Sequence, residues 1–127
     1  MDPTEPVRVS HALHALLRRH AHFADEPELH TAVAEGLREL GLVALHEASL
    51  SRTARADFLV PERGLVVEIK VGGSLADLTR QLYRYAEHEA CRELLVVTTR
   101  AKHRRLPPEI LGKPLELIHL DHLAFQS

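Results

Sequence analysis

The chain has 127 residues, 27% of them charged, and a formal net charge of −2, which is typical of one folded domain and excludes a disordered or strongly basic chain. Its single cysteine, Cys91, excludes an internal disulfide and a zinc site built from several cysteines. No apolar stretch approaches the ~20 residues that a membrane-spanning helix needs, and residues 1–10 lack the pattern of a signal peptide, so we expect a cytoplasmic protein with no membrane partner.

Two amphipathic helices are predicted at the start of the chain. Ser10 is expected to cap a first helix that continues to about Phe23, because apolar side chains recur there at three- and four-residue spacing. Asp25 is expected to cap a second helix that has Pro27 in its first turn and ends at Gly41. We expect the core of the fold to begin with the second helix, so that the first helix is an N-terminal extension.

The pattern then changes to short β-rich runs that are separated by turns and one further helix. A turn is predicted at 61–64, where proline and glycine stand close together, and Ser74 begins a capping box after two glycines. In chain order we predict strands over 42–49, 55–60 and 65–71, a helix from 74 to about 90, strands over 94–99 and 115–120, and a final helical turn at 121–125.

Charged residues are placed unusually in the predicted hairpin around the 61–64 turn. If its strands pair across that turn, Asp57 faces Glu68 and Arg55 faces Lys70, and side-chain alternation puts all four on one face. Like charges directly opposite each other destabilise a sheet, so an Asp opposite a Glu indicates a function. The other face of the hairpin is predicted to carry Phe58, Val60, Val67, Ile69 and Val71.

Two close carboxylates are commonly stabilised by a shared proton or by a hard divalent cation that is bound through oxygen. Asp57 and Glu68 therefore predict a site for a cation such as Mg²⁺. Lys70 lies two residues beyond Glu68 on the same face, where its ammonium would reach whatever the cation binds. This combination suits the hydrolysis of a phosphodiester bond.

These residues resemble a known family. Asp57, followed after a gap by Glu68-Ile69-Lys70 at the end of a strand, resembles the signature of the PD-(D/E)XK nuclease superfamily, although Ala56 stands where the family name has proline. The resemblance implies an α/β fold with a restriction-endonuclease-like core. In that core a central mixed sheet, made of antiparallel hairpin strands plus a parallel strand, is flanked by helices, and here an extra N-terminal helix precedes it.

The resemblance also implies how a cation would be held. Asp57, Glu68 and the main-chain carbonyl of Ile69 would bind Mg²⁺ or Mn²⁺ together with an acid from the first core helix, and Lys70 would aid the attacking water. Residue by residue, that helix acid corresponds to Glu28. Glu28 also fits the capping box of its helix, so two other acids remain alternatives, namely Glu35 and Glu47.

A second motif lies on the helix after the Glu68–Lys70 strand. Gln81 and Tyr85 resemble the Q-x-x-x-Y motif of RecB-like nucleases, in which the Gln helps to position the lysine and the Tyr approaches the nucleic acid. Their i, i+4 spacing puts them on one helix face, where Tyr85 could equally be an ordinary core residue. The cations predicted to contact the nucleic-acid backbone, or else to be plain surface charges, are Arg55, Arg80, Arg84, Arg100, Lys102, Arg104 and Arg105.

The expected function is that of a divalent-metal-dependent DNA endonuclease in a single domain over 1–127, with a helical extension at 1–24 and a nuclease core at 25–127. A free-standing core of this size resembles the archaeal-type Holliday junction resolvases, which act as homodimers, and the N-terminal helix could provide symmetric pairing. One alternative is a RecB-like exonuclease that acts on single strands or ends in repair or defence. Another alternative is a non-catalytic DNA-binding subunit that has kept the fold.

Overall fold

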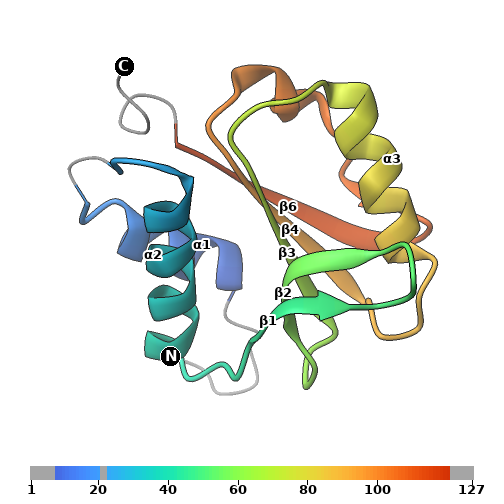
Figure 1. Ribbon diagram of the computed structural model, residues 1–127, viewed down its shortest axis with the longest axis horizontal. Coiled ribbons are helices and arrows are strands. Elements are labelled where there is room, and N and C mark those ends of the chain that lie inside the picture. Colours follow the sequence, from blue (N-terminus) through green and yellow to red (C-terminus); the bar gives the residue numbers. More distant parts are fainter. Residues whose placement is uncertain (1–7, 21–22, 121–127) are drawn as a thin grey trace.

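The structure is a computed structural model that describes residues 8–20 and 23–120. It is an α/β fold in which one mixed sheet lies between helices α1 and α2 on one face and helix α3 on the other (Figure 1). In chain order the elements are α1 (Val9–Leu17), α2 (Glu26–Glu39), β1 (Leu45–Ser49), β2 (Arg55–Val60), β3 (Leu65–Lys70), α3 (Leu75–Ala86), β4 (Glu93–Thr98), the 3₁₀ helix η1 (Ala101–Arg105), β5 (Glu109–Ile110) and β6 (Lys113–His119).

The six strands lie in the order β1-β2-β3-β4-β6-β5. Strands β1, β2 and β3 are antiparallel neighbours, whereas β3, β4 and β6 run parallel, and α3 makes the crossover from β3 to β4. Strand β5 pairs antiparallel with β6 at the far edge. The predicted mixed sheet, with antiparallel hairpin strands joined to a parallel strand, is therefore confirmed.

The two faces of the sheet bury separate apolar clusters. The face toward α1 and α2 carries the residues predicted for it, with Phe58, Val60, Val67 and Ile69 buried and Val71 partly buried. The face toward α3 buries another set, because successive side chains of a strand point to opposite faces. That second set includes Leu59, Val66, Leu94 and Val96 from the sheet and Leu78, Leu82 and Tyr85 from α3.

Two helices begin at the predicted caps. The Asp25 carboxylate accepts a hydrogen bond from the N–H of Glu28 at 2.9 Å, and the Glu28 carboxylate accepts one from the N–H of Ala24 at 2.8 Å. Ser74 caps α3 in the same way, accepting from the N–H of Asp77 at 3.0 Å. Such caps satisfy the N–H groups that a helix start leaves without partners.

The prediction for α1 is wrong at both ends. The helix begins at Val9, so Ser10 is a buried residue inside it rather than its cap. It ends at Leu17, because the next turn is tighter, and Phe23 is buried separately with its ring 5.0 Å from that of His20.

The apolar face of α1 packs against α2 inside the same chain. Leu13 and Leu17 are buried in the cluster that α2 shares with the sheet. Gly36 of α2 permits this close approach, since a Cβ added there would lie 2.5 Å from the Cδ1 of Leu13. The side of α1 that could have paired with a second copy is therefore used within the chain.

The remaining differences concern element ends and short elements. Strand β1 begins at Leu45, and α3 stops at Ala86 because a turn closes from His88 to Cys91. The sequence pattern did not predict η1 or β5. The predicted helical turn at 121–125 lies outside the described residues. Among the residues described, no helix is both long and apolar enough to cross a membrane.

Candidate functional site

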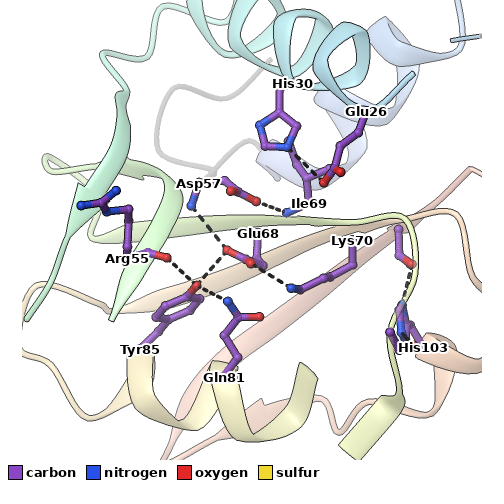
Figure 2. A network of polar contacts seen from close by, with 12 residues as sticks. Glu26, His30, Arg55, Asp57, Glu68, Ile69, Lys70, Gln81, Tyr85 and His103 are labelled. Carbon is purple, nitrogen blue, oxygen red and sulfur yellow. Dashed lines mark hydrogen bonds and ion pairs between the residues drawn. The ribbon is translucent and has the colours of Figure 1, made fainter. Parts of the chain in front are cut away.

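Strands β2 and β3 separate where Asp57 and Glu68 meet. Their main-chain pairing follows the predicted register as far as Phe58 and Val67. Beyond that pair, a carboxylate oxygen of Asp57 accepts a hydrogen bond from the N–H of Ile69 at 2.7 Å, and Glu68 Oε1 lies 3.4 Å from the N–H of Asp57 (Figure 2). Each carboxylate thus binds a main-chain group of the opposite strand, which holds the two acids together.

The backbone around Asp57 departs from a regular strand. Ala56 packs in the cluster facing α3, whereas Phe58, two residues later, packs in the cluster facing α2, so strict alternation breaks at Asp57. On β1, between positions that pair regularly with β2, Glu47 has a φ of 52°, which is uncommon for a residue with a side chain. Backbone irregularities of this kind are concentrated at functional sites.

Arg55 does not face Lys70, contrary to the expectation from the hairpin. It pairs with Ser49 of β1, and its exposed side chain points away from Glu68 (Figure 2). The reason is that β2 and β3 no longer pair at this position, so the alternation assumed from the register does not continue. Arg55 contributes its carbonyl instead, which accepts a hydrogen bond from Tyr85 at 2.8 Å.

Glu68 is almost fully buried, with 3% of its surface exposed. Its Oε1 lies 2.9 Å from the hydroxyl of Tyr85, and its Oε2 lies 3.6 Å from the Nζ of Lys70. Burial, and then the nearby charge of Asp57, raise the pKa of Glu68 from 4.5 to about 7, against the opposing effects of Lys70 and Tyr85. Glu68 therefore exchanges a proton near neutral pH.

The hydroxyl of Tyr85 is surrounded by more acceptors than it has protons. It accepts from the side-chain amide of Gln81 at 2.8 Å, and both the carbonyl of Arg55 and Glu68 Oε1 lie within donating distance. A phenol donates one hydrogen bond, so it cannot satisfy Arg55 and an ionised Glu68 together. A protonated Glu68 can donate to Tyr85, which then donates to Arg55. The network is thus complete when Glu68 carries a proton.

The two residues of the Q-x-x-x-Y motif are therefore connected to Glu68, Tyr85 directly and Gln81 through Tyr85. Burial, followed by the charge of Glu68, raises the pKa of Tyr85, which keeps the phenol protonated. Gln81 contacts Tyr85, so its connection to Lys70 is indirect and passes through Glu68. Of the seven residues predicted as catalytic or metal-binding, the structure brings together six, namely Asp57, Glu68, Ile69, Lys70, Gln81 and Tyr85 (Figure 2).

The predicted helix acid, Glu28, does not join this group. Its carboxylate bonds the N–H of Ala24 as part of the capping box, the alternative role that the sequence allowed. Glu35 and Glu47 line a groove between α2 and β1. Within residues 8–20 and 23–120, no third Asp, Glu, His or Cys completes a metal-binding cluster.

A different pair on α2, which sequence reasoning missed, lies over the same end of the sheet. Glu26 and His30 are seen above Ile69 in Figure 2, and their side chains are 3.6 Å apart. Their i, i+4 spacing is a detectable signal, but many surface pairs share it. Only the packing of α2 on the sheet shows that the pair Glu26 and His30, rather than another surface pair, lies at this end of the sheet.

Three oxygen-bearing groups at the opened hairpin could hold a hard divalent cation. In a strand, the N–H and C=O of one residue point toward the same neighbouring strand, so the carbonyl of Ile69 faces the side of Asp57 as its N–H does. Asp57 is only partly buried and is accessible from outside. Two carboxylates and a carbonyl are a set that Mg²⁺ or Mn²⁺ can use, with solvent or substrate completing the coordination.

A basic segment lies beside Lys70. Strand β4 pairs with β3 so that Thr98 is next to Lys70, and the N–H of Thr99 donates to the carbonyl of Lys70 at 3.2 Å. The exposed cations predicted to follow this strand, Arg100, Lys102, Arg104 and Arg105, are therefore held near the site. Arg80 and Arg84 are exposed on α3, where Arg80 forms an ion pair with Asp77.

His103, to which sequence reasoning assigned no role, anchors that basic segment. It is fully buried, with Nδ1 2.6 Å from the hydroxyl of Thr98 and Nε2 3.3 Å from the carbonyl of Gly73. Since a carbonyl only accepts, Nε2 carries the proton and Nδ1 accepts from Thr98. Burial lowers the pKa of His103, and nearby Lys102 and Arg100 lower it further. The neutral ring thus ties η1 to the loop that follows β3.

Replacement of His103 by Ala is expected to lower the free energy of unfolding by roughly 1–3 kcal/mol, because the buried groups of Thr98 and Gly73 lose their partner. Urea unfolding measures the change, and His11→Ala on exposed α1 surface is the matched control. Equal unfolding midpoints for His103→Ala and the wild type would show that the anchor does not stabilise the fold.

Comparisons of this chain with known protein families, with curated proteins and with solved structures find no match. Functional inference therefore depends on the geometry of the site and on the motif resemblance that led to it.

Proposed function

We propose that this protein is a divalent-metal-dependent nuclease that hydrolyses phosphodiester bonds of DNA, with a restriction-endonuclease-like core. The observation that supports this most directly is the pair of Asp57 and Glu68 at an opened hairpin, with the ammonium of Lys70 3.6 Å from Glu68. Burial, and then the neighbouring charge of Asp57, raise the pKa of Glu68, so an ionised Glu68 is unfavourable in the fold unless a cation is bound.

The residues of the site have distinct parts in the proposed reaction. Asp57, Glu68 and the carbonyl of Ile69 would hold the cation, which when bound supplies Lewis acidity toward a phosphoryl oxygen and lowers the pKa of water. Lys70, whose side chain is 32% exposed, would place its positive charge against the negative charge that develops on the phosphate. Tyr85 holds Glu68 in one orientation.

DNA would approach across the end of the sheet that carries these groups. The exposed cations of the segment from Arg100 to Arg105 lie on the Lys70 side, where they would contact phosphates without reading sequence. Because such contacts release counterions, affinity should fall as salt concentration rises. The formal charge of the whole chain, −2, is consistent with binding that depends on this segment and on the cation.

Two kinds of nuclease remain candidates. The resemblance to the archaeal-type Holliday junction resolvases favours a structure-specific endonuclease, which would act as a homodimer through a surface other than the buried face of α1. The contact of Gln81 with Tyr85, and of Tyr85 with Glu68, favours a RecB-like enzyme acting on single strands or ends. Intact Asp57 and Lys70 argue against a subunit that only binds DNA.

Cleavage of labelled DNAs tests the proposal and separates the candidates. Single-stranded, duplex, flapped and four-way DNAs are incubated with the protein in Mg²⁺, Mn²⁺ or EDTA, and Glu68→Ala is the control. A resolvase is expected to make paired symmetric nicks in the four-way junction. A RecB-like enzyme is expected to produce ladders of products from single-stranded DNA. Equal products from the wild type and Glu68→Ala, or products that persist in EDTA, would contradict the proposed site.

A further inference from the structure

A groove with a volume of about 1050 Å³ lies between α2 and β1, on the face of the sheet opposite α3. Its apolar residues include Ala34, Leu42, Ala44 and Phe58, all of which pack in or against the cluster beneath α2. A groove of this size, apolar within and polar at its edges, has the usual character of a binding site for a small organic group.

The groove contains an aromatic surface that is held in place by its neighbours. The imidazole of His46 stacks on Phe58 with ring centroids 4.9 Å apart and an angle of 23° between the planes. The ring of His30 lies edge-on to His46 at 6.1 Å. Since Phe58 is buried and His46 is exposed, one face of the His46 ring covers Phe58 and leaves the other available to a further flat group.

The groove begins next to the proposed catalytic pair. The side chain of Phe58 faces α2, whereas Glu68 lies on the α3 face. The link between the two is Asp57, whose carboxylate lies between β2 and β3 on the N–H of Ile69. Glu26 and His30, which line the groove, are seen above Ile69 in Figure 2. His46 pairs with Phe58, the residue after Asp57, so a group bound against His46 would lie toward the Asp57 side of the proposed site.

The charges of the groove indicate which part of a nucleic acid would enter it. Glu26, Glu35 and Glu47 lie at its edges against one arginine, Arg38, so the groove repels phosphate. Nucleobases are uncharged and flat, and their N–H groups can donate to carboxylates. The basic segment lies on the other side of the catalytic pair, next to Lys70, so a strand crossing the pair would direct its phosphates there.

We propose that this groove binds unpaired nucleobases next to the phosphodiester that is cut, so that the substrate is single-stranded or locally unpaired DNA. This inference depends on the proposed nuclease function and specifies its substrate class. Bases within a duplex would first have to leave the stack, which is unfavourable. Stacking on His46 would select strands whose bases are already free.

Kinetics on a single-stranded oligonucleotide test the inference. His46→Ala is expected to raise KM by about 5- to 150-fold with little change in kcat, the range that corresponds to the loss of one stacked base. His46→Tyr, which keeps an aromatic face, should restore KM, and His11→Ala on α1 is the matched control. An abasic nucleotide at the position that stacks should raise KM for the wild type and leave KM for His46→Ala unchanged.

A second readout does not require cleavage. Fluorescence of 2-aminopurine placed at successive positions of the oligonucleotide should be altered by stacking in the wild type and not in His46→Ala. Equal KM and equal fluorescence in the two proteins, with Glu68→Ala inactive, would overturn the groove inference and leave the nuclease proposal standing. Failure of the wild type both to cleave and to alter the fluorescence of any oligonucleotide would overturn both.

Discussion

Asp57→Asn and Lys70→Ala are each expected to lower the rate of Mg²⁺-dependent DNA cleavage by roughly 10²–10³-fold or more, because one removes a charged oxygen ligand and the other the charge facing the phosphate. Both variants should fold. In Asp57→Asn the side-chain amide oxygen can still accept from the N–H of Ile69, and Lys70 is partly exposed. The measurement is initial cleavage rate on the best substrate of the panel at saturating Mg²⁺.

A matched control separates the site from a general effect of charge. Asp77→Asn changes an exposed carboxylate on α3 that pairs with Arg80 and lies outside the catalytic group. Its cleavage rate is expected to lie within about twofold of the wild-type rate, because an exposed ion pair contributes little to stability. Wild-type rates for Asp57→Asn, with its metal affinity unchanged in calorimetry, would remove the assigned role of Asp57.

Glu68→Gln is expected to stabilise the metal-free protein above pH 7 while abolishing cleavage. The pKa of Glu68 is about 7 in the fold and 4.5 without it, so the favourable contribution of its protonated form is complete below pH 4.5 and is lost as pH rises through 7. Gln is uncharged at every pH. At pH 8 the variant should therefore exceed the wild type by roughly 3 kcal/mol in free energy of unfolding, and the two should converge near pH 4.5.

Urea unfolding in EDTA between pH 4.5 and pH 8.5 measures this difference. The groups that face Glu68 are Asp57, Lys70 and Tyr85. His103, whose pKa is also shifted, is present in both proteins, so the difference between them reports the titration of Glu68. Added Mg²⁺ should raise the stability of the wild type at pH 8 and have little effect on Glu68→Gln, since a ligand that binds only the folded state stabilises it. A difference between the two proteins that stays constant with pH would contradict the assignment.

If both expectations are met, the site is one in which chemistry is favoured at the expense of stability. A buried carboxylate, a second carboxylate beside it and a tyrosine with two acceptors are all unfavourable arrangements in an ionised, metal-free protein. Removing such a group commonly stabilises a protein while its function is lost. The opposite signs of the predicted effects distinguish a functional acid from a structural one.

Much of the fold follows from patterns that act over a few residues. The structure contains the predicted caps at Asp25 and Ser74 and the predicted span of β2 over Arg55–Val60. It also contains the predicted hairpin register from the turn as far as Phe58 and Val67. These features depend on hydrogen bonds and side-chain alternation within one element or across one tight turn, so the local sequence determines them. The juxtaposition of Asp57 and Glu68 follows from the same local rule.

Other features of the site depend on the tertiary structure, because local sequence patterns do not determine how separate elements pack. The ladder between β2 and β3 ends at Phe58 and Val67, which turned the side chain of Arg55 away from the site. The packing of α2 on the sheet placed Glu26 rather than Glu28 over Ile69. Neither outcome is written in the spacing of the residues concerned, because each depends on how separate elements meet.

The histidines show most clearly the difference between what the sequence predicts and what the tertiary structure decides. His46 and His103 have no distinguishing spacing in the sequence, yet one stacks on Phe58 in an open groove and the other is fully buried between Thr98 and Gly73. Strand alternation in the sequence predicted that Asp57, Glu68 and Lys70 belong together, and the resemblance to the Q-x-x-x-Y motif added Gln81 and Tyr85 to this group. Which histidines, carbonyls and helix acids surround that group was decided by contacts between residues far apart in the chain, whose energies arise only once the sheet is covered on both faces.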